Sequence, residues 1–218
     1  MDNYKIDFLG ISETRWTGAG RMQLANGQTL LYTGRQDNHH SEGIGIVKKL
    51  MEWKPVGSRL LGARFNSKYT KLSIVSCYAP TEDAEEEDKD IFYDQLQHIL
   101  QNVPAHDMLL VIGDFNAKVG NENTGKEQIM GENGCRIMNE NGKQICELCE
   151  ENNLVVGGTL FQHKDIHKLT WTSPDGSTIN QIDHILINRK WRSSLHDVKA
   201  RRSADVASDH SSDWTHIT

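Results

Sequence analysis

Seven polar residues that could do chemistry stand at or near the ends of short apolar runs. They are Glu13, Tyr78, Asp114, Asn116, Asp183, Asp209 and His210. Carboxylates suit Mg²⁺, which takes hard oxygen ligands. A carboxylate or an imidazole can also take a proton from an attacking water, and neutral or cationic donors can stabilise charge developing on a phosphate. The set as a whole therefore favours metal-assisted phosphodiester cleavage.

Each of these residues also has an ordinary structural explanation. A glutamate at a strand end is usually a solvated surface charge, and a tyrosine before Ala-Pro usually packs its ring and exposes its hydroxyl. The segment MLLVIGDFNAKVG at 108–120 shows the choice, because Gly, Asp and Asn commonly end strands in turns and bond their own backbone there. A buried strand that ends on Asp114 and Asn116 fits an active site equally well, and the other motifs favour that interpretation.

The elements that must position these residues are mostly strands. β-Branched and aromatic runs bounded by Gly, Asn and Ser predict strands at 6–12, 29–33, 43–48, 59–65, 70–79, 108–113, 154–157, 168–173 and 182–188. Apolar spacings of three and four predict one helix through Phe92, Leu96 and Leu100, ended by Pro104, and a second helix through Ile145 and Leu148 that ends near 152–153. We expect a turn at 174–176, a solvated acidic segment at 81–90 and a long surface loop at 117–140.

These elements predict the fold class and the domain organisation. Many strands with few helices favour an α+β sandwich of two sheets with helices outside. The sequence has no internal repeat and no linker composition, so we expect a single domain over 1–218.

The composition limits the kinds of partner and compartment. The net charge of −6 argues against a constitutive nucleic-acid coat, which is usually basic, but not against an enzyme that meets DNA through one local basic face and a metal. No run of about 18 apolar residues and no basic-then-apolar leader are present, so we expect neither a membrane span nor a signal peptide.

The four cysteines favour a reducing compartment. They are Cys77, Cys135, Cys146 and Cys149, and few cysteines in a long chain without a signal peptide are typical of intracellular proteins. Cys146-x-x-Cys149 could form half of a zinc site, but no second pair stands at metal-site spacing. We therefore expect two core-facing thiols on a helix.

The motifs resemble a known family when they are taken in order. ISETRW (11–16), CYAPT (77–81), GDFNAKVG (113–120), TWTSPDG (170–176), NQIDHI (180–185) and SDH (208–210) resemble the endonuclease/exonuclease/phosphatase superfamily. The forms WTGAGRM, GDFNAKVG and TWTSPDG…NQIDHI are most similar to the apurinic-like endonuclease domain of long-interspersed-element retrotransposons and to craniofacial development protein 2-like proteins. The resemblance covers nearly all of residues 4–210 and implies a four-layered α/β sandwich of two mixed sheets.

The resemblance also implies a role for each candidate residue. Glu13 matches the glutamate that binds Mg²⁺, with Mn²⁺ as a possible substitute, and Asp209 matches an aspartate near the metal. The remaining five match catalytic positions: Tyr78 and Asn116 contact the phosphate, Asp114 orients or deprotonates the attacking water, and Asp183 holds the histidine His210. The implied substrate is DNA, and a DNA substrate implies a nuclear location, with the cytoplasm as the alternative.

The chain departs from the family pattern at three places. The family opens with a strand that carries an Asn, whereas residues 1–5 here look like the tail of the helix that follows it. The segment after SDH is short and polar where an apolar core strand is expected, so both terminal strands are expected to be absent. His184 stands where the family mostly has an aromatic residue, and we expect it to fill the same semi-buried slot.

These departures leave two alternatives to a DNA endonuclease. One is a catalytically impaired remnant that acts as an interaction protein, which the missing Asn supports. The other is a phosphatase for small molecules such as inositol phosphates, since the superfamily includes such enzymes. The retroelement-like strings TWTSPDG and NQIDHI weigh against the second alternative.

Overall fold

The computed structural model describes residues 9–11, 14–25, 27–37, 39–40, 42–47, 52–66, 69–201 and 212–217. The chain forms two compact units. The first unit comprises Met1–Pro80 and Ala84–Gly113, and the second comprises Thr81–Asp83 and Asp114–Thr218. The single domain expected over 1–218 stays a prediction.

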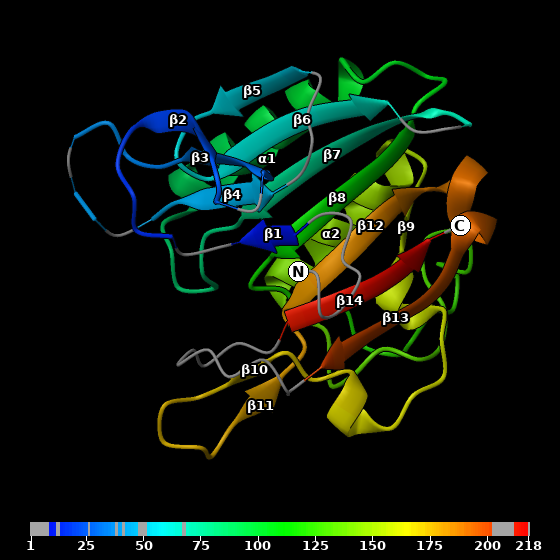
Figure 1. Cartoon of the computed structure of the whole chain (residues 1–218). Coiled ribbons are helices and arrows are strands. Elements are labelled where there is room, and N and C mark those ends of the chain that lie inside the picture. Colours follow the sequence, from blue (N-terminus) through cyan, green and yellow to red (C-terminus); the bar gives the residue numbers. More distant parts are fainter. Residues whose placement is uncertain are drawn as a thin grey trace. The chain divides into compact units, whose positions relative to one another are not determined.

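The first unit contains one helix and two groups of strands. Its elements are β1 (Leu9–Ile11), β2 (Ala19–Gln23), β3 (Thr29–Thr33), β4 (Ile44–Val47), β5 (Glu52–Val56), β6 (Leu60–Asn66), β7 (Lys71–Tyr78), α1 (Glu86–Gln101) and β8 (Met108–Asp114), whose last residue begins the second unit. One sheet has the order β1-β4-β3-β2 with antiparallel pairs throughout, and the other group has the order β5-β6-β7-β8. Strands β3 and β4 pack against β5, β6 and β7, while α1 packs against β6 (Figure 1).

This layering explains the apolar content of the strands. Residues 72–77 on β7 are all buried, as expected for a strand covered on both faces rather than one. The helix α1 buries Phe92, Leu96 and Leu100, which recur at intervals of four and form a single inward stripe. The core of the first unit therefore lies on both sides of the β5–β8 strands.

A buried ion pair joins β6 to the segment before β8. The carboxylate of Asp107 is 2% exposed and accepts hydrogen bonds from Arg64 Nε at 2.6 Å, Arg64 Nη2 at 2.9 Å and Ser73 Oγ at 2.7 Å. The guanidinium of Arg64 is the main reason that the pKa of Asp107 lies below its usual range. The pair fixes the beginning of β8 within the first unit.

In the described residues, the second unit contains the other long helix, several strands and three short 3-10 helices. Its elements are α2 (Glu140–Glu151), β9 (Leu154–Val156), η2 (Gly157–Thr159), η3 (Asp165–His167), β10 (Trp171–Thr172), β11 (Ile179–Asn180), β12 (Asp183–Asn188), η4 (Arg189–Ser194), β13 (Leu195–Arg201) and β14 (Ser212–Ile217). Strand β12 pairs antiparallel with β9, and α2 packs against β9. The pairs β10–β11 and β13–β14 are two further antiparallel ladders (Figure 1).

Most predicted elements are confirmed. The α+β class, both helices and the strands expected at 29–33, 43–48, 59–65, 70–79, 108–113, 154–157 and 182–188 are present within a few residues of their predicted bounds. The segment 117–139 has neither helix nor strand. The strand expected at 168–173 is wrong for most of its length, because only Trp171–Thr172 pairs with β11.

The prediction that no strand follows SDH is wrong. Strand β14 covers Ser212–Ile217 and pairs with β13 from Leu195 to Arg201. Main-chain hydrogen bonds to a partner strand define a strand, so a polar sequence can form one where a partner is available. The expected absence of the opening strand concerns residues 1–8, which lie outside the described residues.

The helices of the described residues are too short or too polar to cross a membrane.

Candidate functional site

Four of the seven predicted site residues lie in the described part of the chain. Tyr78 belongs to the first unit, whereas Asp114, Asn116 and Asp183 belong to the second. Glu13, Asp209 and His210 lie outside the described residues.

The second unit brings the GDFN and NQID segments together. The backbone N–H of Phe115 donates to the carbonyl of Ile182 at 3.0 Å, and Phe115 itself is fully buried. Asp114 and Asn116 flank Phe115, and Asp183 follows Ile182, so one main-chain hydrogen bond joins the two motifs. Thr170 Oγ1 holds the Ile182 side of this junction by accepting from the backbone N–H groups of Ile182 at 3.1 Å and Asp183 at 3.2 Å.

Asp114 and Asn116 form a tight turn at the end of β8. Asp114 is 1% exposed, and its Oδ1 accepts a hydrogen bond from the backbone N–H of Asn116 at 2.8 Å. Asn116 has φ = 49°, a left-handed conformation that asparagine adopts more readily than most residues. The turn predicted from Gly, Asp and Asn is therefore present, and it holds two of the candidate site residues in one fixed backbone geometry.

Gly113 has a different role from the one its position in a turn motif indicates. Strand β8 continues through Gly113 to Asp114, so the chain does not turn at the glycine. Its φ is 143°, and a Cβ at this position would lie 2.0 Å from the carbonyl oxygen of Cys77 on β7. Glycine is required here because the backbones of β7 and β8 approach so closely within the first unit.

His184 ties β12 to the segment after GDFN. Its ring is 2% exposed, and its Nε2 lies 2.7 Å from the carbonyl oxygen of Ala117. A carbonyl only accepts hydrogen bonds, so Nε2 carries the hydrogen. Burial lowers the pKa of His184, while the hydrogen bond to Ala117 and the charge of Asp183 act in the opposite direction. His184 was expected to be semi-buried, and it is in fact fully buried. Its neutral ring makes one specific hydrogen bond there.

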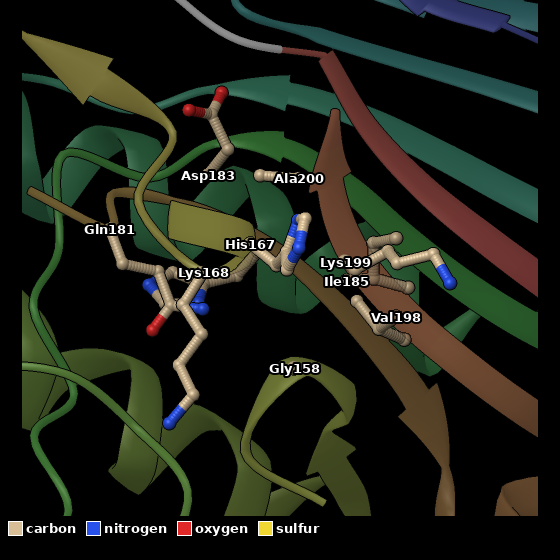
Figure 2. A pocket seen from close by; sticks show the side chains of 10 residues that line it. Gly158, His167, Lys168, Gln181, Asp183, Ile185, Val198, Lys199 and Ala200 are labelled. Carbon is tan, nitrogen blue, oxygen red and sulfur yellow. The ribbon is translucent and has the colours of Figure 1, made fainter. Parts of the chain in front are cut away.

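A small pocket of the second unit adjoins Asp183. Asp183 is half-buried at one edge of it, and the side chains of Lys168 and Lys199 extend away from its centre (Figure 2). Its walls also include Gln181 and His184. The space holds about one water molecule, so it is too small for a nucleotide. A polymeric substrate would therefore have to meet Asp183 from outside this pocket.

Tyr78 ends β7 in the first unit, next to a cation. The guanidinium carbon of Arg59 lies 5.2 Å from the centre of the Tyr78 ring, and Arg59 Nη1 donates to the Tyr78 carbonyl at 3.3 Å. Arg59 also pairs with Glu42 at 2.7 Å, which balances part of its charge. A sequence motif centred on Tyr78 gives no signal for Arg59.

The described residues include no group of three or more His, Cys, Asp or Glu side chains arranged to hold a metal. Asp114 and Asp183 carry carboxylate oxygens, the kind of donor that Mg²⁺ prefers, but the roles predicted for them concern the water and His210 rather than the metal. The predicted metal ligands Glu13 and Asp209 lie outside the described residues. Cys146 and Cys149 are buried on α2, as predicted, and burial raises the pKa of both thiols.

Comparison with known families and curated relatives extends this picture. The model of a family described as endonuclease-reverse transcriptase matches residues 72–212. Craniofacial development protein 2 of Tragulus javanicus is 39% identical over 215 residues, which is 96% of this chain and 37% of that protein. The protein of the same name from Bos taurus is 40% identical over 215 residues, covering 96% and 36% respectively. The chain thus spans little more than a third of these relatives.

Several solved structures have the same fold. The endonuclease domain of TRAS1, a telomere-specific non-LTR retrotransposon, gives a TM-score of 0.63 at 14% identity over 99% of this chain and 87% of its own. The AP endonuclease LMAP from Leishmania major gives 0.71 at 12% identity, covering 99% and 79%. The 3'-5' exonuclease NExo from Neisseria meningitidis gives 0.69 at 15% identity, covering 97% and 89%. At these identities the likeness concerns the fold alone, and it confirms the predicted sandwich fold.

Proposed function

Because this chain belongs to the endonuclease-reverse transcriptase family, we propose that it is a Mg²⁺-dependent endonuclease that nicks DNA and is of retrotransposon origin. The observation that carries the proposal is the hydrogen bond from Phe115 N to Ile182 O at 3.0 Å. It joins the segments that hold Asp114, Asn116 and Asp183, the three predicted site residues that the structure describes in the second unit.

The proposed roles follow from the chemistry of each side chain. Asp114 orients the attacking water or takes its proton, and its burial in a fixed turn limits the number of geometries in which it can do so. Asn116 donates a neutral hydrogen bond to a phosphate oxygen. Asp183 holds His210 in one tautomer and favours its charged form, so that the imidazolium can face the phosphate.

Two further parts complete the proposal. Tyr78 contacts the scissile phosphate, and the adjacent guanidinium of Arg59 makes that approach favourable for an anion. Glu13 and Asp209 would hold Mg²⁺, with Mn²⁺ as a substitute, and the bound ion would supply Lewis-acid stabilisation of the leaving oxygen. A DNA substrate also leads us to propose a nuclear location, which microscopy of a fluorescent fusion would test.

The decisive experiment measures the nicking of supercoiled plasmid by the purified chain with Mg²⁺ and with EDTA. Asp114→Asn keeps the size of the side chain and removes its charge, so we expect the nicking rate to fall by about 10²–10⁴-fold, the range for loss of a general base. EDTA should abolish nicking by the wild-type chain.

Asp175→Asn is the matched control. Asp175 Oδ1 accepts a hydrogen bond from the backbone N–H of Ser177 at 3.1 Å, the same two-residue turn that Asp114 makes, but at an exposed position. Its nicking rate should equal that of the wild type. A folded wild-type chain that does not nick, or equal rates for Asp114→Asn and wild type, would refute the proposal. Release of phosphate from inositol phosphates in a parallel assay would favour the small-molecule phosphatase instead.

A further inference from the structure

The backbone carbonyl of Asn116 is held by two asparagine side chains from the start of α2. Asn139 Nδ2 donates to it at 3.3 Å and Asn141 Nδ2 donates to it at 3.1 Å. Asn116 has φ = 49°, and a non-glycine residue in this region costs of order 1 kcal/mol unless its surroundings hold it there. Two convergent donors on one carbonyl provide such a restraint.

Asn139 restrains the same loop a second time. Its Oδ1 accepts from the backbone N–H of Lys118 at 2.8 Å and from that of Gly142 at 2.9 Å, and its own backbone N–H donates to the Lys118 carbonyl at 3.1 Å. The bond to Gly142 is an ordinary helix N-cap. The bonds to Lys118 have no role in capping, so the same side chain links the helix to the loop.

The loop and the helix are in direct backbone contact here. A Cβ on Gly142 would lie 2.0 Å from the carbonyl oxygen of Lys118, so only glycine allows this approach. The sequence Asn139-Glu140-Asn141-Gly142 therefore has two asparagines that bind the loop and one glycine that admits it.

Glu82, from a segment far away in the sequence, binds the side chain of Asn139 and the backbone of Asn141. Its carboxylate accepts hydrogen bonds from Asn139 Nδ2, from the backbone N–H of Glu140 at 3.1 Å and from that of Asn141 at 3.4 Å. A carboxylate at this helix N-terminus is also favoured by the helix dipole. Glu82, Asn139 and Asn141 belong to the second unit, as does Asn116.

We propose that Asn139 and Asn141, oriented by Glu82, are positioning residues that hold Asn116 in the geometry it needs to contact a phosphate. The inference rests on the proposed function, in which Asn116 makes that contact. Asn141 carries the clearest case. It is 1% exposed, it is not the N-cap of α2, and its side-chain amide is directed at the loop carbonyl. Neither asparagine touches the reacting atoms, so both act through Asn116.

Asn141→Asp tests the proposal with almost no change in volume. The variant loses both side-chain N–H donors and places a carboxylate oxygen against the Asn116 carbonyl. We expect kcat for plasmid nicking to fall by about 10–100-fold, the usual effect of removing a residue that orients a catalytic group, with KM nearly unchanged. We also expect backbone amide hydrogen exchange across 116–118 to become at least several-fold faster.

Asn152→Asp is the matched control at the other end of the same helix. Asn152 Nδ2 donates to the Leu148 carbonyl at 2.9 Å, so the substitution also breaks an amide-to-carbonyl hydrogen bond. It should lower the melting temperature without changing kcat or the exchange of 116–118. Glu82→Ala, at an exposed position, is the second variant in case Asn141→Asp does not fold, and a several-fold smaller kcat is expected for it.

Three outcomes would overturn the proposal. Equal loss of kcat in Asn141→Asp and Asn152→Asp would mean that global stability is responsible. A raised KM with unchanged kcat would mean that Asn141 binds substrate directly. Unchanged exchange across 116–118 would mean that the two amides do not restrain the loop. If the wild-type chain does not nick DNA, the proposed function fails, and the exchange experiment still decides whether the restraint exists.

Discussion

Replacing His184 by glutamine should remove part of the acid sensitivity of the fold. His184 is 2% exposed and donates through Nε2 to the Ala117 carbonyl at 2.7 Å. Burial disfavours the charged ring and lowers its pKa, although Ala117 and the neighbouring Asp183 act in the opposite direction. Glutamine keeps an amide donor at this site and cannot be protonated, so His184→Gln separates the titration from the hydrogen bond.

The sign of the effect follows from which state binds the proton. In the unfolded chain the ring titrates near its ordinary pKa of about 6.5, whereas in the folded chain it titrates at lower pH. The unfolded state therefore binds more protons as the pH falls below about 7, and stability falls until the pH passes the folded pKa. While the folded ring stays neutral, lowering the pH from 7.5 to 5.5 costs about 1.4 kcal/mol from this one group.

Melting temperatures measured at pH 7.5 and 5.5 test this reasoning. For a chain of this size, about 1 kcal/mol corresponds to about 2–4 °C, so the wild type should lose about 3–6 °C more than His184→Gln on acidification. His106→Gln, an exposed histidine, is the control and should behave as the wild type. Equal acid-induced losses in wild type and His184→Gln would refute the assignment of a buried, neutral ring.

Three further predictions concern stability and reactivity. Arg64→Met removes the guanidinium from buried Asp107 and should lower the free energy of unfolding in urea by about 3 kcal/mol. Gly113→Ala places a Cβ 2.0 Å from the Cys77 carbonyl at φ = 143°, so we expect a fall in melting temperature of about 6 °C or more or loss of the folded protein. The four cysteines are buried thiols that are not paired in disulfides, so a thiol reagent at neutral pH should label them rapidly only after the chain is unfolded.

Two substitutions are the controls for Arg64→Met and Gly113→Ala. Arg35→Met breaks an exposed ion pair with Asp37 and should leave the free energy of unfolding nearly unchanged, because exposed ion pairs contribute little to stability. Gly176→Ala has open space for its Cβ at φ = 70° and should cost about 1 kcal/mol. If Arg64→Met were as mild as Arg35→Met, the pair would not be structurally important. If Gly113→Ala were as mild as Gly176→Ala, the inference that β7 and β8 leave no space for a Cβ at Gly113 would be wrong. Rapid labelling of the native protein would show that a thiol is accessible.

The sequence predicted the buried strands better than the edge strands. Strand β8 was predicted to within a residue because a strand buried on both faces is continuously apolar. Strand β2 was missed because four of its five residues are exposed and it lies at the edge of its sheet. Strand β5 contains Pro55, which argues against a strand except at an edge, and β5 is an edge. Strand β13 was missed because a register shift between Leu195 and Asp197 interrupts the alternation of its buried residues Leu195, Val198 and Ala200.

Motif resemblance predicted the residues of the candidate site. It did not predict the residues that hold them in place. No local pattern connects Glu82 with Asn139, because 57 residues separate them and the bond exists only after folding. The acidic run that contains Glu82 indicated a solvated loop, and Glu82 itself is exposed, yet its carboxylate accepts from the N-terminus of α2. His184 was expected only to fill a semi-buried space. Its hydrogen bond to Ala117 depends on how β12 lies against the segment after GDFN, which composition does not reveal.

The turn and the proposed site at 114–116 are therefore one structure rather than alternatives. Asp114 bonds the backbone of Asn116, and the next peptides are held in turn by the Ile182 carbonyl, by two asparagines of α2 and by His184. A turn held only by its own residues would sample several conformations, because a local hydrogen bond contributes only about 1 kcal/mol net. Restraints from two separate segments, 139–141 and 182–184, narrow those conformations, which is what a site that positions a water and a phosphate requires. The backbone bond of Asp114, typical of a plain turn, is thus compatible with the catalytic role that we propose for this residue.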